Sequence, residues 1–172
     1  KRTHSLDIAQ TLLSSEGVPS ESADPVDVLT TYYAHTDRLL PTAESDVTVS
    51  PEPFRTHHYD GNELEREVQA LVDSVREFED YLAGGYLHGS FGDREYVTNY
   101  SDVDMVLVVS KETLVDSDAL FELRRKLQPL ARHYYYIDPH QHHETMVIAE
   151  PELRAYNRAY LPPAALSRST SI

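Results

Sequence analysis

The stretch that decides the fold reads Leu87-His88-Gly89-Ser90, then eleven residues, then Asp102-Val103-Asp104 and the apolar run Met105-Val106-Leu107-Val108-Val109. The small residues Gly89 and Ser90 predict a turn, and the apolar run predicts a buried strand. Because side chains alternate along a strand, we expect Asp102 and Asp104 to share one face. Val103 and Met105 are then expected to point into the core.

Two neighbouring carboxylates in an apolar strand are costly unless a cation lies between them. Hard oxygen ligands, in a chain without cysteine, favour Mg²⁺ or Mn²⁺. Gly89, which has no Cβ, allows the backbone to approach a bound group closely. The Ser90 hydroxyl and the N–H groups after the turn are suited to bind an anion. Gly-Ser alone is a common turn, so it is the Asp pair that marks this stretch as a candidate site for a divalent metal.

The spacing of Gly-Ser and the Asp pair resembles the signature of the DNA polymerase β-like nucleotidyltransferase superfamily, in particular its small stand-alone members. His88-Gly89-Ser90 and Tyr100-Ser101-Asp102-Val103-Asp104 carry the resemblance, which extends over residues 62–150. It implies an α+β (α/β) fold, with a small mixed β-sheet flanked by helices as in the polymerase β palm. It also implies transfer of a nucleoside monophosphate (NMP) from an NTP to a hydroxyl of a small molecule or protein, with release of pyrophosphate.

The resemblance also implies roles for individual residues. Asp102 and Asp104 are expected to bind two Mg²⁺ (or Mn²⁺) ions, and Gly89 and Ser90 to hold the β and γ phosphates of the NTP. A neighbouring strand usually supplies a third carboxylate. We expect this to be Asp138, at the end of an aromatic strand over residues 133–137, where it can complete an ion's ligand shell and accept a proton. Glu144 is the rival, and an Asp before Pro is also typical of a turn.

Three histidines, His140, His142 and His143, follow Asp138. Their density suggests zinc or nickel, but on a strand only the first two share a face. The stretch also resembles an Asp-Pro-x-Gln-His-His pattern in an uncharacterised group of nucleotidyltransferase-like proteins, in which Gly tends to stand where this chain has Glu144. We interpret the His pair as shaping or hydrogen-bonding the active site.

Composition limits the substrates and the setting. The 172 residues suggest one domain with an appendage, and the formal net charge is −14. An acidic surface repels phosphate backbones, so a long nucleic acid is disfavoured as substrate. A salt-adapted organism or a GC-rich genome explains the same bias. The chain lacks cysteine, a signal-peptide pattern and any apolar run of the ~18 residues that a membrane span needs, so we expect no membrane association and a cytoplasmic setting.

Three segments are expected along the chain. Residues 1–60 form a helical or irregular extension, with a short helix ending at Gly17, a helix capped by Asp24 that runs towards Leu40, and a short strand over 46–50. Residues 61–161 form the nucleotidyltransferase core, and residues 162–172 a flexible tail, disordered from residue 167.

Within the core, helices are predicted over 62–83, capped by Asn62 and stopped by Gly84-Gly85, over 116–130, capped by Asp116, and from residue 153. The predicted strands before the Asp pair and after the second helix are residues 86–88 and 133–137. Basic residues are densest between 111 and 132, which we interpret as a solvated helix face: Lys111, Arg124, Arg125, Lys126 and Arg132.

Two alternatives to an active enzyme stay open. The first is a catalytically degenerate module that binds a nucleotide or a protein partner, and the second is an interaction domain without a nucleotide site. Many superfamily members continue into a helical domain that holds the acceptor. Few residues follow the core here, so we expect the acceptor to be held by the N-terminal extension, by a protein partner or by a missing domain.

Overall fold

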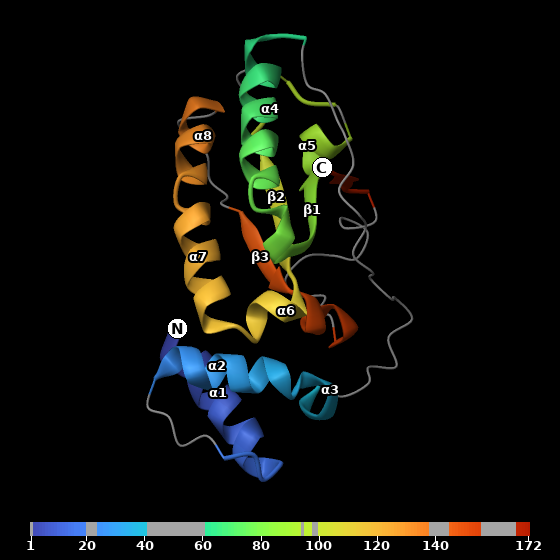
Figure 1. Ribbon diagram of the computed structural model, residues 1–172. Coiled ribbons are helices and arrows are strands. Elements are labelled where there is room, and N and C mark those ends of the chain that lie inside the picture. The colour runs from blue at the N-terminus through green and yellow to red at the C-terminus, as the bar shows by residue number, and fades with distance from the viewer. Residues whose placement is uncertain are drawn as a thin grey trace.

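The computed structural model describes residues 2–19, 24–40, 61–93, 95–97, 100–137, 145–155 and 168–172. Among these residues, a four-stranded sheet has the strand order β3-β2-β1-β4 (Figure 1). β1 (Leu82–His88) and β2 (Asp104–Val109) pair antiparallel, β3 (Met146–Ala149) runs parallel to β2, and β4 (Thr170–Ser171) pairs antiparallel with β1. The chain is therefore an α+β protein with a small mixed sheet and flanking helices.

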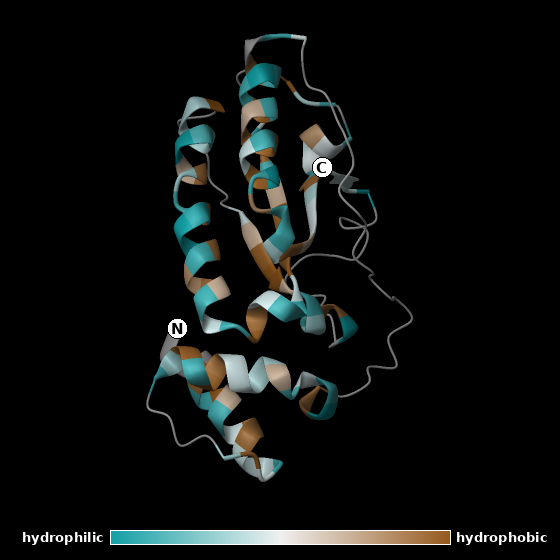
Figure 2. Ribbon diagram, in the orientation of Figure 1, coloured by the Kyte–Doolittle hydropathy of each residue, from teal (hydrophilic) through white to brown (hydrophobic). Residues whose placement is uncertain are grey.

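One face of the sheet is covered by α4 (Glu63–Arg76), with α7 (Ser117–Leu127) and α8 (Leu130–Ile137) beside it (Figure 1). β2 is hydrophobic and β1 is mostly of intermediate hydropathy, whereas these helices carry both hydrophobic and hydrophilic residues along their length (Figure 2). This is the pattern of amphipathic helices packed on a buried sheet. The main core joins both layers and includes the fully buried residues Val68, Leu71, Val72, Val75, Leu87, Phe91, Val103 and Leu107.

Helix α4 begins as predicted and ends earlier than predicted. Asn62 Oδ1 accepts a hydrogen bond from the backbone N–H of Glu65 at 2.9 Å, which confirms the cap. The helix ends at Arg76 and not at 83, and the 3₁₀ turn η1 (Glu79–Tyr81) leads into β1. Gly84 therefore lies in a strand and does not stop the helix. A Cβ on Gly84 would lie 2.8 Å from Tyr86 Oη, so the glycine makes room for the Tyr86 ring.

The connection from β2 to the parallel strand β3 is helical, as parallel pairing requires a crossover. It contains α6 (Lys111–Leu114), α7 and α8. Asp116 Oδ1 accepts hydrogen bonds from the N–H groups of Asp118 and Ala119 at 2.9 and 3.1 Å, which confirms the predicted cap of α7. The predicted helix over 116–130 is divided near Pro129, which cannot donate a helical hydrogen bond.

The strand predicted over residues 133–137 is wrong, because these residues belong to α8. Leu130, Tyr134 and Ile137 are buried at the i, i+4, i+7 spacing of a helix face that packs against α4. Ser74 of α4 and the His133 ring lie 3.0 Å apart, within hydrogen-bond distance. Packing against α4 therefore outweighs the β propensity of three consecutive tyrosines.

The prediction of a disordered tail from residue 167 is wrong for residues 168–172. β4 pairs with β1 through Tyr86↔Ser171 and Leu87↔Thr170. The Ile172 N–H donates to the Gly85 carbonyl at 3.0 Å, and the Ile172 side chain is fully buried. This segment is therefore part of the sheet and of the main core.

The N-terminal helices are α1 (Arg2–Ser15), α2 (Pro25–Ala34) and α3 (Thr36–Leu39). Asp24 caps α2 as predicted, accepting from the Val26 N–H at 2.8 Å, but a break at His35 separates α2 from α3. The strand predicted over 46–50 lies outside the described residues. None of the helices in the described part of the chain is long and apolar enough to span a bilayer.

Polar contacts join α2 and α3 to the rest of the molecule. Asp37 lies 2.6 Å from both the Lys111 ammonium and the Arg154 guanidinium, and the Lys111 hydrogen bond lowers the pKa of Asp37. Tyr33 donates to the exposed Glu152 at 3.5 Å, and partial desolvation of the carboxylate raises the pKa of Glu152. These contacts bind the N-terminal helices to α6 and to η2 (Glu150–Ala155).

Candidate functional site

The sheet brings the two halves of the sequence motif together. β1 ends at His88, which is paired with Asp104 at the start of β2. Gly89 follows His88 with φ of +65°, in the left-handed region that favours glycine. A Cβ on Gly89 would lie 2.9 Å from Asp104 Oδ2. Glycine is therefore required both by the backbone conformation and by the close approach of the Asp104 carboxylate.

The carboxylate pair stands at the surface end of a buried strand. Val103 and Met105 are 0% and 1% exposed, as predicted, whereas Asp102 and Asp104 are half-buried. The strand begins at Asp104, two residues later than predicted, so Asp102 lies in the segment that leads into it. The alternation of buried and half-buried residues nevertheless continues back to Asp102.

Aromatic packing fixes the turn after β1 to the core. Gly89 begins the single-turn helix α5 (Gly89–Gly92), whose Phe91 is fully buried. The Tyr96 ring stacks on Phe91 with centroids 4.6 Å apart and planes 3° apart. The Tyr96 hydroxyl donates a hydrogen bond to Glu65 of α4, which raises the pKa of Tyr96. The connection that follows the Gly-Ser turn is therefore fixed to the core helix.

Two further contacts support the same turn. A Cβ on the buried Gly92 would lie 2.6 Å from the Leu87 carbonyl oxygen, so α5 packs tightly against β1. The Thr170 hydroxyl donates to the Gly92 carbonyl at 2.7 Å, which ties β4 to α5. The half-buried Ser90 accepts at its carbonyl from the Glu95 N–H at 2.8 Å. Ser90 thus lies on a turn that contacts with both β1 and β4 hold in place.

A second small turn leads to Asp102. The Val97 N–H donates to Ser101 Oγ at 2.8 Å, and the Ser101 N–H donates back to the Val97 carbonyl at 2.9 Å. Tyr100, within this turn, is 85% exposed. The reciprocal pair of hydrogen bonds fixes the backbone directly before the first carboxylate.

Sequence reasoning missed the supporting residues of this site. Tyr96, Glu65 and Thr170 are far apart in the chain, and no local pattern connects them. The stacking of Tyr96 on Phe91 has no clear sequence signal, because Val97 and Tyr100 in the same connection are equally plausible packing residues. Residues that position a turn through long-range contacts are visible only once the fold is known.

The third carboxylate stays a prediction. Asp138, Glu144, His140, His142 and His143 lie outside the described residues. The basis for choosing Asp138 is weakened, because residues 130–137 form a helix and not a strand beside β2. The parallel neighbour of β2 is β3, which begins at Met146, two positions after Glu144.

The metal-binding potential of the site rests on two carboxylates in the part of the chain that the structure describes. No group of three His, Cys, Asp or Glu side chains suited to a metal occurs among those residues. Asp102 and Asp104 supply the hard oxygen donors that Mg²⁺ and Mn²⁺ prefer, and their half-buried position leaves them accessible to an ion. The donor chemistry therefore fits a divalent cation whose other ligands come from elsewhere.

Comparisons of this chain with models of known protein families, with curated proteins and with solved structures found no match.

Proposed function

We propose that this chain is a metal-dependent nucleotidyltransferase with a polymerase β-like fold. It would transfer an NMP group from an NTP to a hydroxyl of a small molecule or protein and release pyrophosphate. The observation that carries the proposal is the approach of Gly89 to Asp104, which joins a glycine turn to a carboxylate at the ends of neighbouring strands. The mixed sheet flanked by helices is compatible with the proposed fold.

Each residue of the site has a role in this proposal. The backbone after Gly89 and the Ser90 hydroxyl hold the β and γ phosphates, so that binding energy serves to orient the α-phosphorus. Asp102 and Asp104 would hold Mg²⁺ or Mn²⁺, and the bound ion would neutralise phosphate charge and lower the pKa of the acceptor hydroxyl. The half-buried setting of both carboxylates limits the water around them.

The reaction balances without any further reactant. The acceptor oxygen forms a bond to the α-phosphorus, and the bond from that phosphorus to the bridging oxygen of the β phosphate breaks. Pyrophosphate leaves with that oxygen, and the hydroxyl proton passes to a carboxylate. Asp138 and Glu144 are the candidates for this proton acceptor.

The charge of the chain guides the choice of acceptor. With a formal net charge of −14, the surface disfavours a long nucleic acid and mildly favours cationic acceptors. A protein partner or a helical domain outside this chain would then help to hold the acceptor. The base of the NTP is left open in the proposal.

Labelled NTPs test the proposed function. The chain is incubated with each NTP and Mg²⁺, with and without cell extract, and both pyrophosphate and labelled products are measured. We expect Asp104→Asn to abolish pyrophosphate release while the unfolding temperature stays the same or rises, because the substitution removes one of two neighbouring like charges. Asp80→Asn on η1 is the matched control and is expected to stay active. Full activity of Asp104→Asn would contradict the proposal, and nucleotide binding without pyrophosphate release would favour the degenerate module.

A further inference from the structure

We propose that the outer face of α7 and α8 binds an acidic amphipathic helix of a partner protein. We call this face the Arg-aromatic stripe, and its exposed side chains are Phe121, Arg124, Arg125, Arg132, Tyr135 and Tyr136. The inference goes beyond the proposed nucleotidyl transfer and does not depend on it. It also revises the interpretation of the basic residues as a merely solvated helix face.

Helical spacing places the stripe on one side of the two helices. Phe121, Arg124 and Arg125 stand at i, i+3, i+4 on α7. Arg132, Tyr135 and Tyr136 repeat this spacing on α8. The residues buried between them, which pack into the main core, are Leu123, Leu130, Tyr134 and Ile137. The stripe therefore points away from the core.

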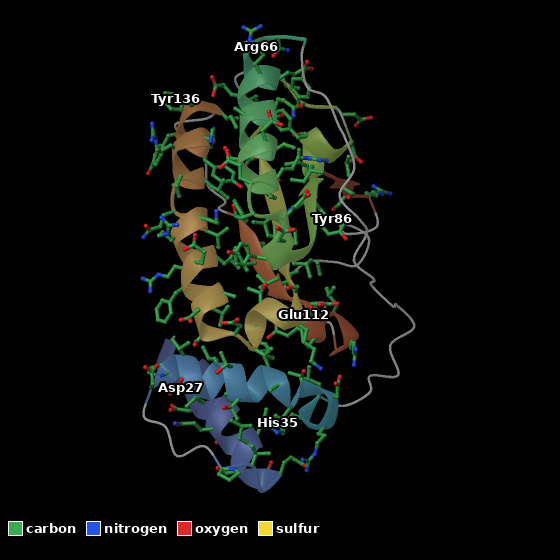
Figure 3. All side chains as sticks on the ribbon, viewed as in Figure 1. Asp27, His35, Arg66, Tyr86, Glu112 and Tyr136 are labelled. Carbon is green, nitrogen blue, oxygen red and sulfur yellow. The ribbon has the colours of Figure 1, made fainter. Side chains whose placement is uncertain are left out.

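The aromatic side chains of the stripe are unusually accessible. Tyr135 and Tyr136 are each 71% exposed and Phe121 is 55% exposed. Neither tyrosine hydroxyl has a hydrogen-bond partner among the described residues. Tyr136 lies near the end of α8 (Figure 3). The two tyrosines lie together at one end of the stripe and Phe121 lies at the other. Exposed rings of this kind are suited to binding, because an aromatic side chain buries a large area at low cost in conformational entropy.

The charges of the stripe favour carboxylates on the partner. Arg125 is neutralised by Glu122, with contacts of 3.0 and 2.6 Å. The side chains of Arg124 and Arg132 make neither an ion pair nor a hydrogen bond within the described part of the chain. Arginine and aromatic residues are enriched at interface centres, and the guanidinium matches carboxylate geometry. In a chain of net charge −14, two uncompensated arginines beside exposed rings are a site for an acidic surface.

The shape of the stripe favours a helix as the occupant. α7 and α8 form one column at the edge of the molecule (Figure 1). At 1.5 Å per residue, Phe121 and Tyr136 are separated by about 22 Å along this column, the length of a helix of about 15 residues. A twofold dimer through the stripe would oppose arginines to arginines, and a nucleic acid would meet a strongly acidic protein. An acidic helix avoids both penalties.

A designed peptide tests the inference on the full chain. The probe is an amphipathic helix of about 15 residues with Leu on one face and Glu beside it. Its match has Gln in place of every Glu. We expect the Glu peptide, but not the Gln peptide, to shift the ring signals of Tyr135 and Tyr136 in NMR spectra of the chain. Arg132→Glu and Tyr136→Ala should each raise the Kd at least about tenfold, as for central interface residues. Arg38→Glu on the distant α3 changes charge equally and should alter the Kd less than about twofold.

Each of the following outcomes would overturn the inference. They are no binding of the Glu peptide, equal binding of the Gln peptide, tighter binding of a single-stranded oligonucleotide, and concentration-dependent shifts of the stripe without peptide, which indicate self-association. Mapping the shifts on the unsubstituted chain keeps the test decisive if a variant fails to fold. Shifts confined to other faces would equally overturn it.

Discussion

Replacing Gly89 with alanine tests two reasons for a glycine at this position, the positive φ of its backbone and the close approach of Asp104. The backbone there has φ of +65°, a conformation that costs a residue with a Cβ about 1–2 kcal/mol. The new Cβ would also lie 2.9 Å from Asp104 Oδ2. Because that oxygen ends a side chain, the carboxylate is able to rotate away at a small cost in stability. The rotation, however, removes Asp104 from the position proposed to hold the metal.

Gly17 offers a matched control. It has φ of +67°, but a Cβ there would meet no atom within 4 Å. Gly17→Ala therefore carries the conformational strain alone. At about 2–4 °C per kcal/mol for a chain of this size, both variants should lose about 2–8 °C in Tm. Gly89→Ala should lose slightly more.

Thermal unfolding and Mg²⁺-dependent pyrophosphate release distinguish the two variants. Gly17→Ala should keep the activity of the unsubstituted chain, whereas Gly89→Ala should lose it despite a similar Tm. An active Gly89→Ala variant would refute the reasoning that the turn and Asp104 act together. A Gly89→Ala variant that is more stable than Gly17→Ala would refute the assignment of strain to the close approach.

Two further predictions concern stability. Ile172→Ala should cost about 2 kcal/mol, the lower end for a buried Ile because the segment can partly collapse, and urea unfolding that shows no change would contradict the burial of Ile172 beside β1. Partial desolvation of the Glu152 carboxylate, which is still exposed, raises its pKa above the ordinary 4.5, so the folded state binds that proton somewhat more tightly than the unfolded state and loses a little stability as pH rises through the raised pKa. At pH 7 the Glu152→Gln variant should therefore have a higher free energy of unfolding than the parent chain, and below pH 4.5 this difference should disappear. Urea unfolding at pH 7 and at pH 4 measures the difference. An equal difference at the two pH values would contradict the raised pKa of Glu152.

Local signals in the sequence predicted local structure well. The helix caps at Asp24, Asn62 and Asp116 could be predicted because capping is a local interaction. In each case the side chain accepts a hydrogen bond from a backbone N–H two or three residues later. The burial of Val103 and Met105 followed from the two-residue period of a strand. These interactions lie within a few positions of the chain, so the residues themselves carry the information.

Long-range packing explains the failures. Residues 133–137 have high β propensity, yet their burial against α4 makes them a helix. Residues 170–172 have no strong strand pattern, yet an open edge of β1 pairs with them. The approach of Gly89 to Asp104 and the support of the turn by Tyr96 likewise depend on distant partners. The third carboxylate was predicted from a strand that the structure replaces with a helix.

The hydrogen bond from Thr170 to Gly92 has a consequence for biosynthesis. The two residues are 78 positions apart in the chain. At a translation rate of 5–20 residues per second, the ribosome adds the later partner about 4–16 s after the earlier one. During that interval α5 lacks one of its supports and β1 lacks one of its neighbours. The glycine turn therefore reaches its final form only after Thr170 has been added, and until then it stays incomplete while the helices α4, α7 and α8 are already available to fold.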